Sequence, residues 1–229
     1  MDILQAGGVG IIPTDTCYSF VTLIHNAEGI RRILKLKGEG MKKPLSLLCK
    51  DIATISKYSS SLSDQKWVFK ILKSTLPGPY TIILPSSKEV PSVLVDHKKH
   101  MRRWKRREIG VRIPHDEICL FLTHSLEQPL ISGSVPEFRE DEDITYLDAI
   151  SAEESVPMDT EVSSDADGSC SHQISWMGRW ANDIDFIVDN GARGGSRVEE
   201  GRSTVLDLTS GEALVLRQGS GIFEAATSR

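Results

Sequence analysis

Residues 7–18 read GGVGIIPTDTCY, and the fold can be deduced outward from this stretch. Its paired glycines are typical of a helix end, so residues 2–6 are predicted to form a short helix. Residues 9–12 are apolar and are followed by a proline, a pattern that predicts a short strand. Residues 13–16 place a proline and three polar side chains directly after this strand. Open α/β sheets usually bind ligands at such strand ends.

Strands and helices alternate along the rest of the chain. Asn26 is predicted to cap a helix over residues 27–37. A second helix is predicted to be capped by Ser63 and to have an apolar face at Trp67, Val68, Ile71 and Leu72. A third helix is predicted over residues 116–126, with an apolar face at Ile118, Leu120, Phe121 and Leu122. Further strands are predicted at residues 18–23, 45–49, 80–84, 109–113, 130–132, 185–188, 204–208 and 213–216. This alternation predicts an α/β fold with one main sheet.

The net charge of -5 is the sum of two unlike parts. Twelve acidic residues and one basic residue lie between Glu137 and Asp167. The remaining chain has 26 Lys or Arg and 20 Asp or Glu, so it is basic. Residues 139–172 also contain few large apolar side chains and cannot bury enough surface to offset the entropy of ordering. We therefore predict a single domain over residues 1–229 that carries a disordered acidic insertion at 139–172.

The positive charge is concentrated in one segment, which also contains a tryptophan. Its members are Lys98, Lys99, Arg102, Arg103, Trp104, Lys105, Arg106 and Arg107. Such a segment can neutralise several phosphates while the indole stacks on a base, which makes these residues candidates for RNA binding. The structural alternative is a solvated loop without a partner.

The composition excludes several classes of protein. No apolar run approaches the ~20 residues of a membrane-spanning helix, and the first residues lack the features of a secretory signal. The sequence therefore predicts a soluble, cytoplasmic protein, or an organellar one if a longer form carries a transit peptide. The four cysteines lie far apart and suit neither a disulfide framework nor a zinc site, so we interpret them as small core residues.

Candidate binding residues recur near the ends of strands and helices. Arg112 is the most informative, because it lies in an otherwise apolar strand. Burial of its charge there costs free energy unless an anion pairs with the guanidinium. Each candidate also has a structural explanation, since a polar turn can satisfy its own backbone and Arg112 can form an internal ion pair. The chain contains neither the P-loop nor the dinucleotide-binding glycine motif.

Six motifs in this order resemble the YrdC-like family, which includes threonylcarbamoyl-AMP synthases. They are residues 7–18, Lys37-Gly38 with Lys43-Pro44-Leu45, residues 76–81, residues 111–114, residues 129–134 and residues 203–208. The resemblance covers nearly the whole chain except the acidic insertion. It implies a YrdC/RibB-like open, twisted mixed sheet with helices packed on it around a positively charged cavity.

The family's enzymes combine L-threonine, bicarbonate and ATP with Mg²⁺ to form threonylcarbamoyl-adenylate and pyrophosphate, for N6-threonylcarbamoyladenosine at position 37 of tRNA. By position, the resemblance implies that L-threonine is bound by Thr16, Arg112, Ser132 and Ser203. It assigns ATP to Lys37, Lys43, Ser134 and Arg217. No catalytic nucleophile and no metal ligand of the protein is predicted, because the protein only positions the reactants.

Two departures place the chain nearer to the YciO-like branch of this family than to the main synthase branch. The family's K-x-R motif is Lys37-Gly38-Glu39 here, so a carboxylate replaces a guanidinium. The family's S-x-N motif is Ser134-Val135-Pro136, and proline has neither the amide side chain nor an N–H. Loss of one charge-assisted contact, worth about 1.5–3 kcal/mol, would reduce nucleotide binding or rate.

Two kinds of function therefore remain. One is an ATP-dependent threonylcarbamoyl-AMP synthase, and the other is a protein of the same fold that binds double-stranded RNA or tRNA with little or no synthesis. A regulatory hypothesis is that the acidic segment folds over the basic residues and competes with RNA or nucleotide. Its alternative is a solubilising loop.

Overall fold

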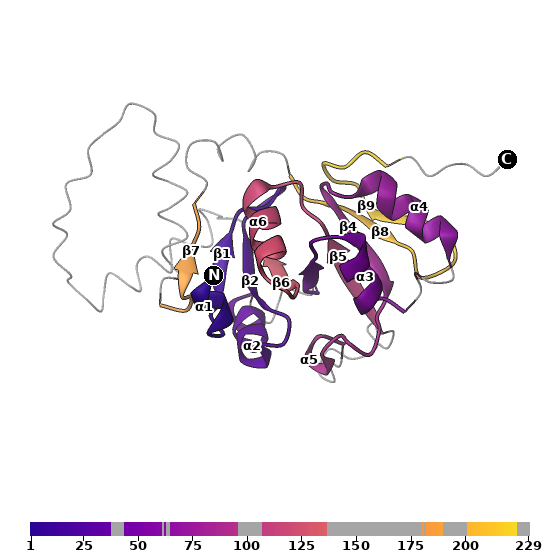
Figure 1. The fold of residues 1–229 in the computed structure, drawn as a ribbon. Coiled ribbons are helices and arrows are strands. Elements are labelled where there is room, and N and C mark those ends of the chain that lie inside the picture. The colour runs from indigo at the N-terminus through magenta and orange to yellow at the C-terminus, as the bar shows by residue number, and fades with distance from the viewer. Residues whose placement is uncertain are drawn as a thin grey trace, which may run out of the picture.

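The structure is a computed structural model, and it describes residues 1–37, 44–60, 62, 65–95, 107–136, 180, 182–189 and 201–223. Nine strands form one mixed sheet in the order β7-β1-β2-β6-β3-β5-β4-β8-β9 (Figure 1). Three neighbouring pairs are parallel (β1 with β7, β3 with β5, β4 with β8), and the other five are antiparallel. The predicted α/β fold with an open mixed sheet is confirmed.

The strands agree with the predicted positions to within a few residues at each end. They are β1 (Gly10–Ile12), β2 (Ser19–Leu23), β3 (Ser46–Leu48), β4 (Tyr80–Pro85), β5 (Glu108–Arg112), β6 (Leu130–Ser134), β7 (Phe186–Ile187), β8 (Thr204–Asp207) and β9 (Leu214–Arg217). The helices are α1 (Asp2–Gln5), α2 (Ala27–Leu36), α3 (Ile52–Tyr58), α4 (Lys66–Thr75), α5 (Ser92–Val95) and α6 (Glu117–Ser125).

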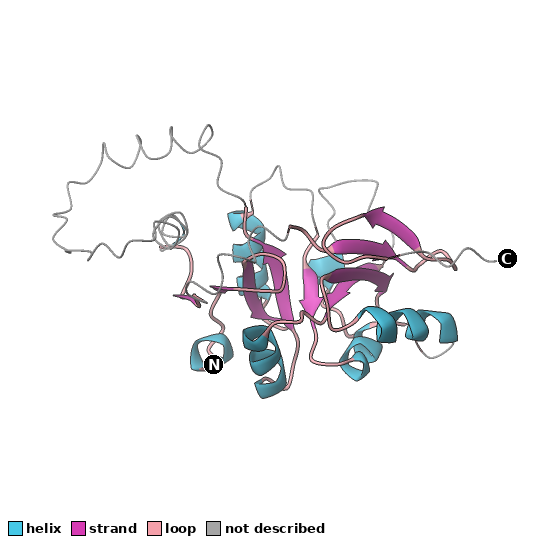
Figure 2. Ribbon diagram, turned by 90° about the horizontal axis from the view of Figure 1, so that it is seen from above, coloured by secondary structure: helices cyan, strands magenta, loops and turns pink. Residues whose placement is uncertain are grey.

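At β1 and β2 the sheet buries both of its faces, and neighbouring strand residues alternate between two apolar clusters. Ile11 and Phe20 face the larger cluster, which also receives apolar residues of α2, α3 and α4. Ile12 and Val21 face the smaller cluster, which contains Leu4 of α1 and the buried side of α6. Figure 2 shows helices on both sides of the strands. This alternation explains why the short strands consist almost wholly of apolar residues.

Local sequence signals fix several helix starts. The Asn26 side chain accepts a hydrogen bond from the backbone N–H of Gly29 at 2.9 Å, so the predicted cap of α2 is confirmed. Asp116 caps α6 in the same way by accepting from Ile118 and Cys119. Gly7 follows the first helix with a φ of 91°, in the left-handed region, so the helix end that the paired glycines predicted is confirmed.

Some predictions about the helices were wrong or lie outside the described residues. Phe121 was placed on the apolar face of α6, but it is 64% exposed; Leu122 is buried as predicted, together with Cys119 and Thr123, which were not predicted. The error arose because α6 is apolar nearly all round, so spacing alone could not choose the buried side. Helices α3 and α5 were not predicted. The proposed cap Ser63 lies outside the described residues, and Gln65 stands at the N-cap of α4.

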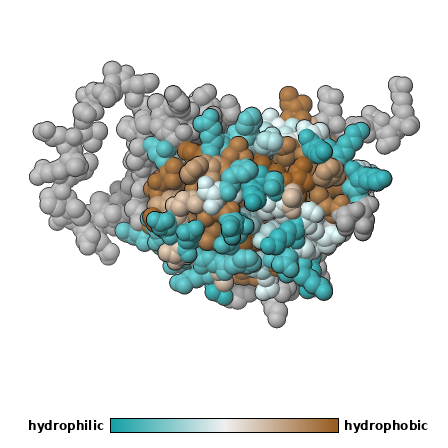
Figure 3. All heavy atoms as spheres, in the orientation of Figure 1, coloured by the Kyte–Doolittle hydropathy of each residue, from teal (hydrophilic) through white to brown (hydrophobic). Residues whose placement is uncertain are grey.

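The apolar surface is distributed rather than continuous on the face that Figure 3 presents, where hydrophobic and hydrophilic residues interleave. In the described part of the chain, no helix is both long and apolar enough to cross a membrane. The predicted acidic insertion at residues 139–172 lies outside the described residues. Its disorder therefore stays a prediction.

Candidate functional site

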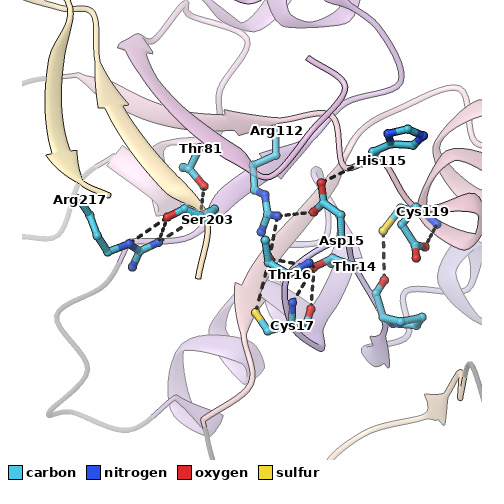
Figure 4. Close-up of polar contacts among 12 residues, drawn as sticks. Thr14, Asp15, Thr16, Cys17, Thr81, Arg112, His115, Cys119, Ser203 and Arg217 are labelled. Atoms are coloured by element: carbon cyan, nitrogen blue, oxygen red, sulfur yellow. Dashed lines mark hydrogen bonds and ion pairs between the residues drawn. The ribbon is translucent and has the colours of Figure 1, made fainter. Parts of the chain in front are cut away.

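A compact polar turn follows β1 and is closed by one hydroxyl. The side chain of Thr14 donates to the carbonyl of Cys17 at 2.6 Å and accepts from the backbone N–H groups of Thr16 and Cys17. This pattern is the structural role that a polar turn can have by itself. It also fixes the backbone that carries Asp15 and Thr16, which both turn toward β5 (Figure 4).

Arg112, the last residue of β5, contacts both of these side chains. Its Nη2 donates to Asp15 Oδ1 at 2.7 Å and to Thr16 Oγ1 at 2.9 Å. All three residues are buried, and Asp15 also accepts from the backbone N–H of His115. The sequence argument that Arg112 needs an anion is therefore answered by Asp15. An ion pair this deeply buried is stabilising only because both groups are hydrogen-bonded.

The Arg112 guanidinium is nevertheless not saturated. Its Nε is buried and has no hydrogen-bond partner among the described residues. Since an unsatisfied buried donor is costly, this edge of the guanidinium is suited to an additional acceptor. A carboxylate oxygen fits well, because a charge-assisted hydrogen bond to a guanidinium N–H is stronger than a neutral one.

A second polar group surrounds Ser203, which directly precedes β8. Its hydroxyl lies 2.8 Å from Thr81 Oγ1 of β4. Arg217, at the end of β9, donates from Nε and Nη2 to the Ser203 carbonyl and from Nη2 to the Ser203 hydroxyl. The sheet explains this meeting, because β4 begins beside the start of β8 while β9 ends there.

The two groups lie close enough to interact electrostatically. Burial lowers the pKa of Arg217, and the positive charges of Arg202 and Arg112 lower it further. The end of β5 and the start of β4 are neighbours in the sheet, which brings Arg112 toward Ser203 (Figure 4). The structure therefore brings together four predicted residues, namely Thr16, Arg112, Ser203 and Arg217.

Other predicted residues are not gathered into this cluster by any contact that the structure describes. The Ser132 hydroxyl is buried and donates to the Ser46 carbonyl at 3.3 Å. Ser134 is exposed and lies at the opposite end of β6 from Leu130. Leu130 pairs with Leu48 of β3, and Leu48 in turn pairs with Arg112 of β5. Their predicted ligand contacts stay predictions.

Lys37 is buried although it carries a charge, with 5% of its surface exposed. Its side chain lies across Gly133 of β6, where a Cβ would come within 2.9 Å of Lys37 Cδ and 3.1 Å of Nζ. A glycine is therefore needed for this close approach. Lys43 lies outside the described residues, as do Lys98, Lys99, Arg102, Arg103, Trp104 and Arg106. Arg107 is exposed just before β5.

The cysteines have different environments. Burial raises the pKa of both Cys49 and Cys119, so these thiols stay protonated, as expected of core residues. Cys17 is only half-buried beside Thr16, so its assignment to the core was wrong, and Cys170 lies outside the described residues. The described residues include no group of three or more His, Cys, Asp or Glu side chains that could hold a metal ion.

The sequence matches a protein-family model. The model Sua5_yciO_yrdC, described as Telomere recombination, matches residues 2–156. The chain belongs to the Sua5/YciO/YrdC family. The predicted resemblance is thereby confirmed.

Relatives within this family differ in how much of the chain they match. The uncharacterized protein YciO of Escherichia coli is 27% identical over 96% of this chain and 87% of its own length. Its crystal structure superposes with a TM-score of 0.68. Human threonylcarbamoyl-AMP synthase is 28% identical over 56% of this chain and 41% of its own length. The similarity to YciO thus extends along the chain, as the departures at Glu39 and Pro136 predicted.

A Sua5 structure shows that the fold is shared more widely. P. abyssi Sua5 complexed with L-threonine has a TM-score of 0.67 at 22% identity and matches 95% of this chain and 52% of its own. At this identity the likeness establishes the fold alone.

Sequence reasoning missed two residues of the candidate site. Asp15 was seen only as part of a polar turn, and Thr81 only as part of a motif. The need of Arg112 for an anion was the signal that could have identified Asp15, because few acidic residues lie beside buried strands. No comparable signal marked Thr81, whose contact with Ser203 spans 122 positions of sequence.

Proposed function

We propose that this protein is a threonylcarbamoyl-AMP synthase-like enzyme that uses ATP, L-threonine and bicarbonate for N6-threonylcarbamoyladenosine formation in tRNA. The observation that carries the proposal is the buried Arg112, whose Nε has no hydrogen-bond partner in the part of the chain that the structure describes, although Asp15 and Thr16 occupy its Nη2. A free amino acid offers the carboxylate that this edge lacks. The relatives named as synthases, and the threonine bound to Sua5, support threonine as that amino acid.

The described residues would act by position and charge. Arg112 and Thr16 would hold the carboxylate, and Ser203 would bind the threonine side chain or carboxylate. Arg217 and Lys37 would neutralise negative charge as pyrophosphate leaves the adenylate. The amine and bicarbonate would react directly once they are held together, so no nucleophile of the protein is required.

Magnesium would enter as a complex with the nucleotide. Mg²⁺ prefers carboxylate, phosphate and water oxygens in octahedral geometry. Because the described residues present no acidic cluster for it, the triphosphate would supply the oxygen ligands.

A synthesis assay tests the proposal. Purified full-length protein is incubated with ATP, Mg²⁺, bicarbonate and L-threonine, and pyrophosphate and the adenylate are measured. We expect threonine-dependent product from the unaltered chain and none from Arg112→Ala. Arg112→Lys keeps a charge for Asp15 and serves as the variant that preserves the fold. If the unaltered chain makes no more threonine-dependent product than Arg112→Ala, the proposal is wrong.

The sequence departure at Glu39 gives a second test. Replacing this carboxylate by arginine restores a phosphate-binding guanidinium, so Glu39→Arg should tighten ATP binding by about tenfold or more. Isothermal titration with ATP, with and without threonine, measures the change. An unchanged affinity would show that residue 39 does not face the nucleotide.

RNA binding is the second candidate function, and the basic run before β5 favours it. A filter-binding titration with tRNA and duplex RNA should give an affinity that falls steeply with salt. Changing Arg102, Arg103, Arg106 and Arg107 to Ala should then weaken binding. Salt-independent binding, or no effect of the four substitutions, contradicts this function.

A further inference from the structure

Thr81 of β4 and Arg112 of β5 are neighbours on one face of the sheet. Ile82 pairs with Val111, and both of these side chains belong to the larger apolar cluster. Successive residues of a strand point to opposite faces, so Thr81 and Arg112 point away from that cluster. Each is the next residue beyond the same strand pair, and such cross-strand neighbours have their Cβ atoms about 5 Å apart. A ligand of amino-acid size that binds Arg112 can therefore also reach Thr81.

The Thr81 side chain is oriented by its neighbours on both sides. Its Cγ2 methyl lies over Gly110 of β5, where an added Cβ would be only 3.2 Å from that methyl. Its hydroxyl lies on the side of β8, 2.8 Å from Ser203 Oγ (Figure 4). Ser203 is buried and Thr81 is half-buried, so the two hydroxyls are partly shielded from water. Thr81 thus stands between Arg112 and Ser203.

The Thr81 and Ser203 hydroxyls hold one proton more than their contacts use. Arg217 Nη2 donates to Ser203 Oγ at 3.1 Å, and a guanidinium can only donate. The hydrogen bond between Thr81 and Ser203 uses one hydroxyl proton, whichever of the two donates. The other O–H therefore has no acceptor among the residues that the structure describes.

The charge of Arg217 sets the direction of this hydrogen-bond chain. Hydrogen bonds in series polarise one another, so a hydroxyl that accepts from a cation becomes a better donor. Arg217 therefore favours donation from Ser203 to Thr81, which leaves the Thr81 O–H as the spare donor. This donor lies next to Arg112, on the side where a ligand carboxylate is proposed to bind.

A side-chain hydroxyl is the ligand group that complements Thr81. It can accept the spare proton and can also donate to a lone pair of Thr81. In a β-hydroxy amino acid the carboxylate and the hydroxyl are carried by adjacent carbons, so the first can bind Arg112 while the second binds Thr81. An amino acid without the hydroxyl leaves the shielded O–H unpaired, and such a loss is the basis of strong discrimination.

We propose that Thr81, held by Ser203 and Arg217, recognises the side-chain hydroxyl of a β-hydroxy amino acid and so determines the specificity of the site. This inference rests on the proposed function and deepens it, because it concerns the amino acid bound at the same place. It accounts for rejection of valine, which has a methyl group where threonine has its hydroxyl. The role of Thr81 is binding, and the reaction takes no proton or covalent bond from it.

The test compares the binding of L-threonine and L-valine to the full chain by isothermal titration. The unaltered chain should bind threonine about tenfold or more tightly than valine. Thr81→Val keeps the shape of the side chain and removes its hydroxyl, so threonine binding should weaken by about tenfold while valine binding does not. Thr81→Ser retains the hydroxyl and should retain the preference. Thr123→Val is the matched control, because the Thr123 hydroxyl donates to the Cys119 carbonyl within α6, and it should leave the preference unchanged.

The outcomes separate this inference from the proposed function. A preference in Thr81→Val that equals that of Thr123→Val overturns the role of Thr81, as does an unaltered chain that binds the two amino acids equally or binds neither. A chain whose preference depends on Thr81 but which forms no threonine-dependent adenylate would retain this site and lack the proposed synthesis. Adenylate formation together with a preference that Thr81→Val leaves intact would retain the synthesis and reject this inference. Circular dichroism checks the fold of each variant, and Thr81→Ala, which also lacks the hydroxyl, gives the same readout if Thr81→Val does not fold.

Discussion

The ion pair between Asp15 and Arg112 is buried at the candidate site. Both side chains are less than one-tenth exposed, so their mutual charge is poorly screened by water. Asp15 accepts a hydrogen bond from Nη2 of the guanidinium, and Nε has no hydrogen-bond partner within the described ranges of the chain. Asp15 therefore neutralises the charge of Arg112 without occupying Nε.

Removal of Asp15 should be far more harmful than removal of the whole pair. Asp15→Ala leaves a buried guanidinium without its anion, and we expect a loss of about 3–5 kcal/mol of unfolding free energy. The double variant Asp15→Ala with Arg112→Met removes both charges and should recover most of that loss. Urea denaturation monitored by circular dichroism measures each value. Equal losses in the single and the double variant would contradict an electrostatic origin.

Sequence reasoning identified Arg112 but not the arrangement around it. A charged residue in an apolar strand signals that compensation is needed, whereas the identity of the partner depends on a contact across 97 positions. Ser132 illustrates the same difficulty, because its hydroxyl is directed to the Ser46 carbonyl by strand pairing that no local pattern reveals. Residue types were thus easier to predict than their contacts.

At the level of elements, helix caps were predictable where the capping residue stands next to an amphipathic run. Asn26 precedes such a run and was recognised, whereas Asp51 precedes the short α3 and was not. The Asp51 side chain accepts from both the hydroxyl and the N–H of Thr54 at 2.6 Å. Seven residues give too little periodicity to reveal a helix, so only the cap signal was available.

The Asp51 cap predicts a defined pH dependence. The hydrogen bonds from Thr54 hold the pKa of Asp51 below its ordinary value of 3.8. A carboxyl with a lowered folded pKa stabilises the native state above the unfolded pKa and loses that contribution as the pH falls through the folded pKa. Asp51→Ala should therefore cost about 1 kcal/mol at neutral pH and less in acid below pH 3.8.

Thermal denaturation of the unaltered chain and of Asp51→Ala across this pH range measures the difference. Asp51→Asn is the matched control, since it keeps a capping oxygen without a titrating charge. The free-energy difference between Asp51→Asn and Asp51→Ala should not change with pH, because neither variant titrates at residue 51. A cost of Asp51→Ala that is constant from neutral pH to acid would contradict this account of the cap.

At the scale of the whole molecule, the sheet brings distant segments to one place. The start of β8 and the end of β9 carry Ser203 and Arg217, and both lie beside the start of β4 and the end of β5. The order of the central strands could not be predicted from the chain alone, because β5 and β6 are sequential yet are separated by β3. The family resemblance supplied the overall architecture instead.

Removing residues 139–172 tests whether this acidic segment competes with RNA for the basic residues of the chain. Its acidic residues oppose the basic remainder of the chain, so deletion with a short glycine-serine linker should strengthen RNA binding at low salt. Filter binding of tRNA to the full chain and to the deletion variant measures the effect. A second deletion variant in which an uncharged linker of equal length replaces the segment controls for chain length. Unchanged RNA binding at low salt would rule out competition by the acidic segment.

The most direct test of the central claim is the binding of L-threonine and L-threoninol to the full chain by isothermal titration. These ligands differ only in the carboxylate that we assign to the unpartnered edge of Arg112. The account predicts that threonine binds and that threoninol binds about tenfold more weakly or not at all. Equal affinity for the two ligands, or no binding of threonine, would contradict it.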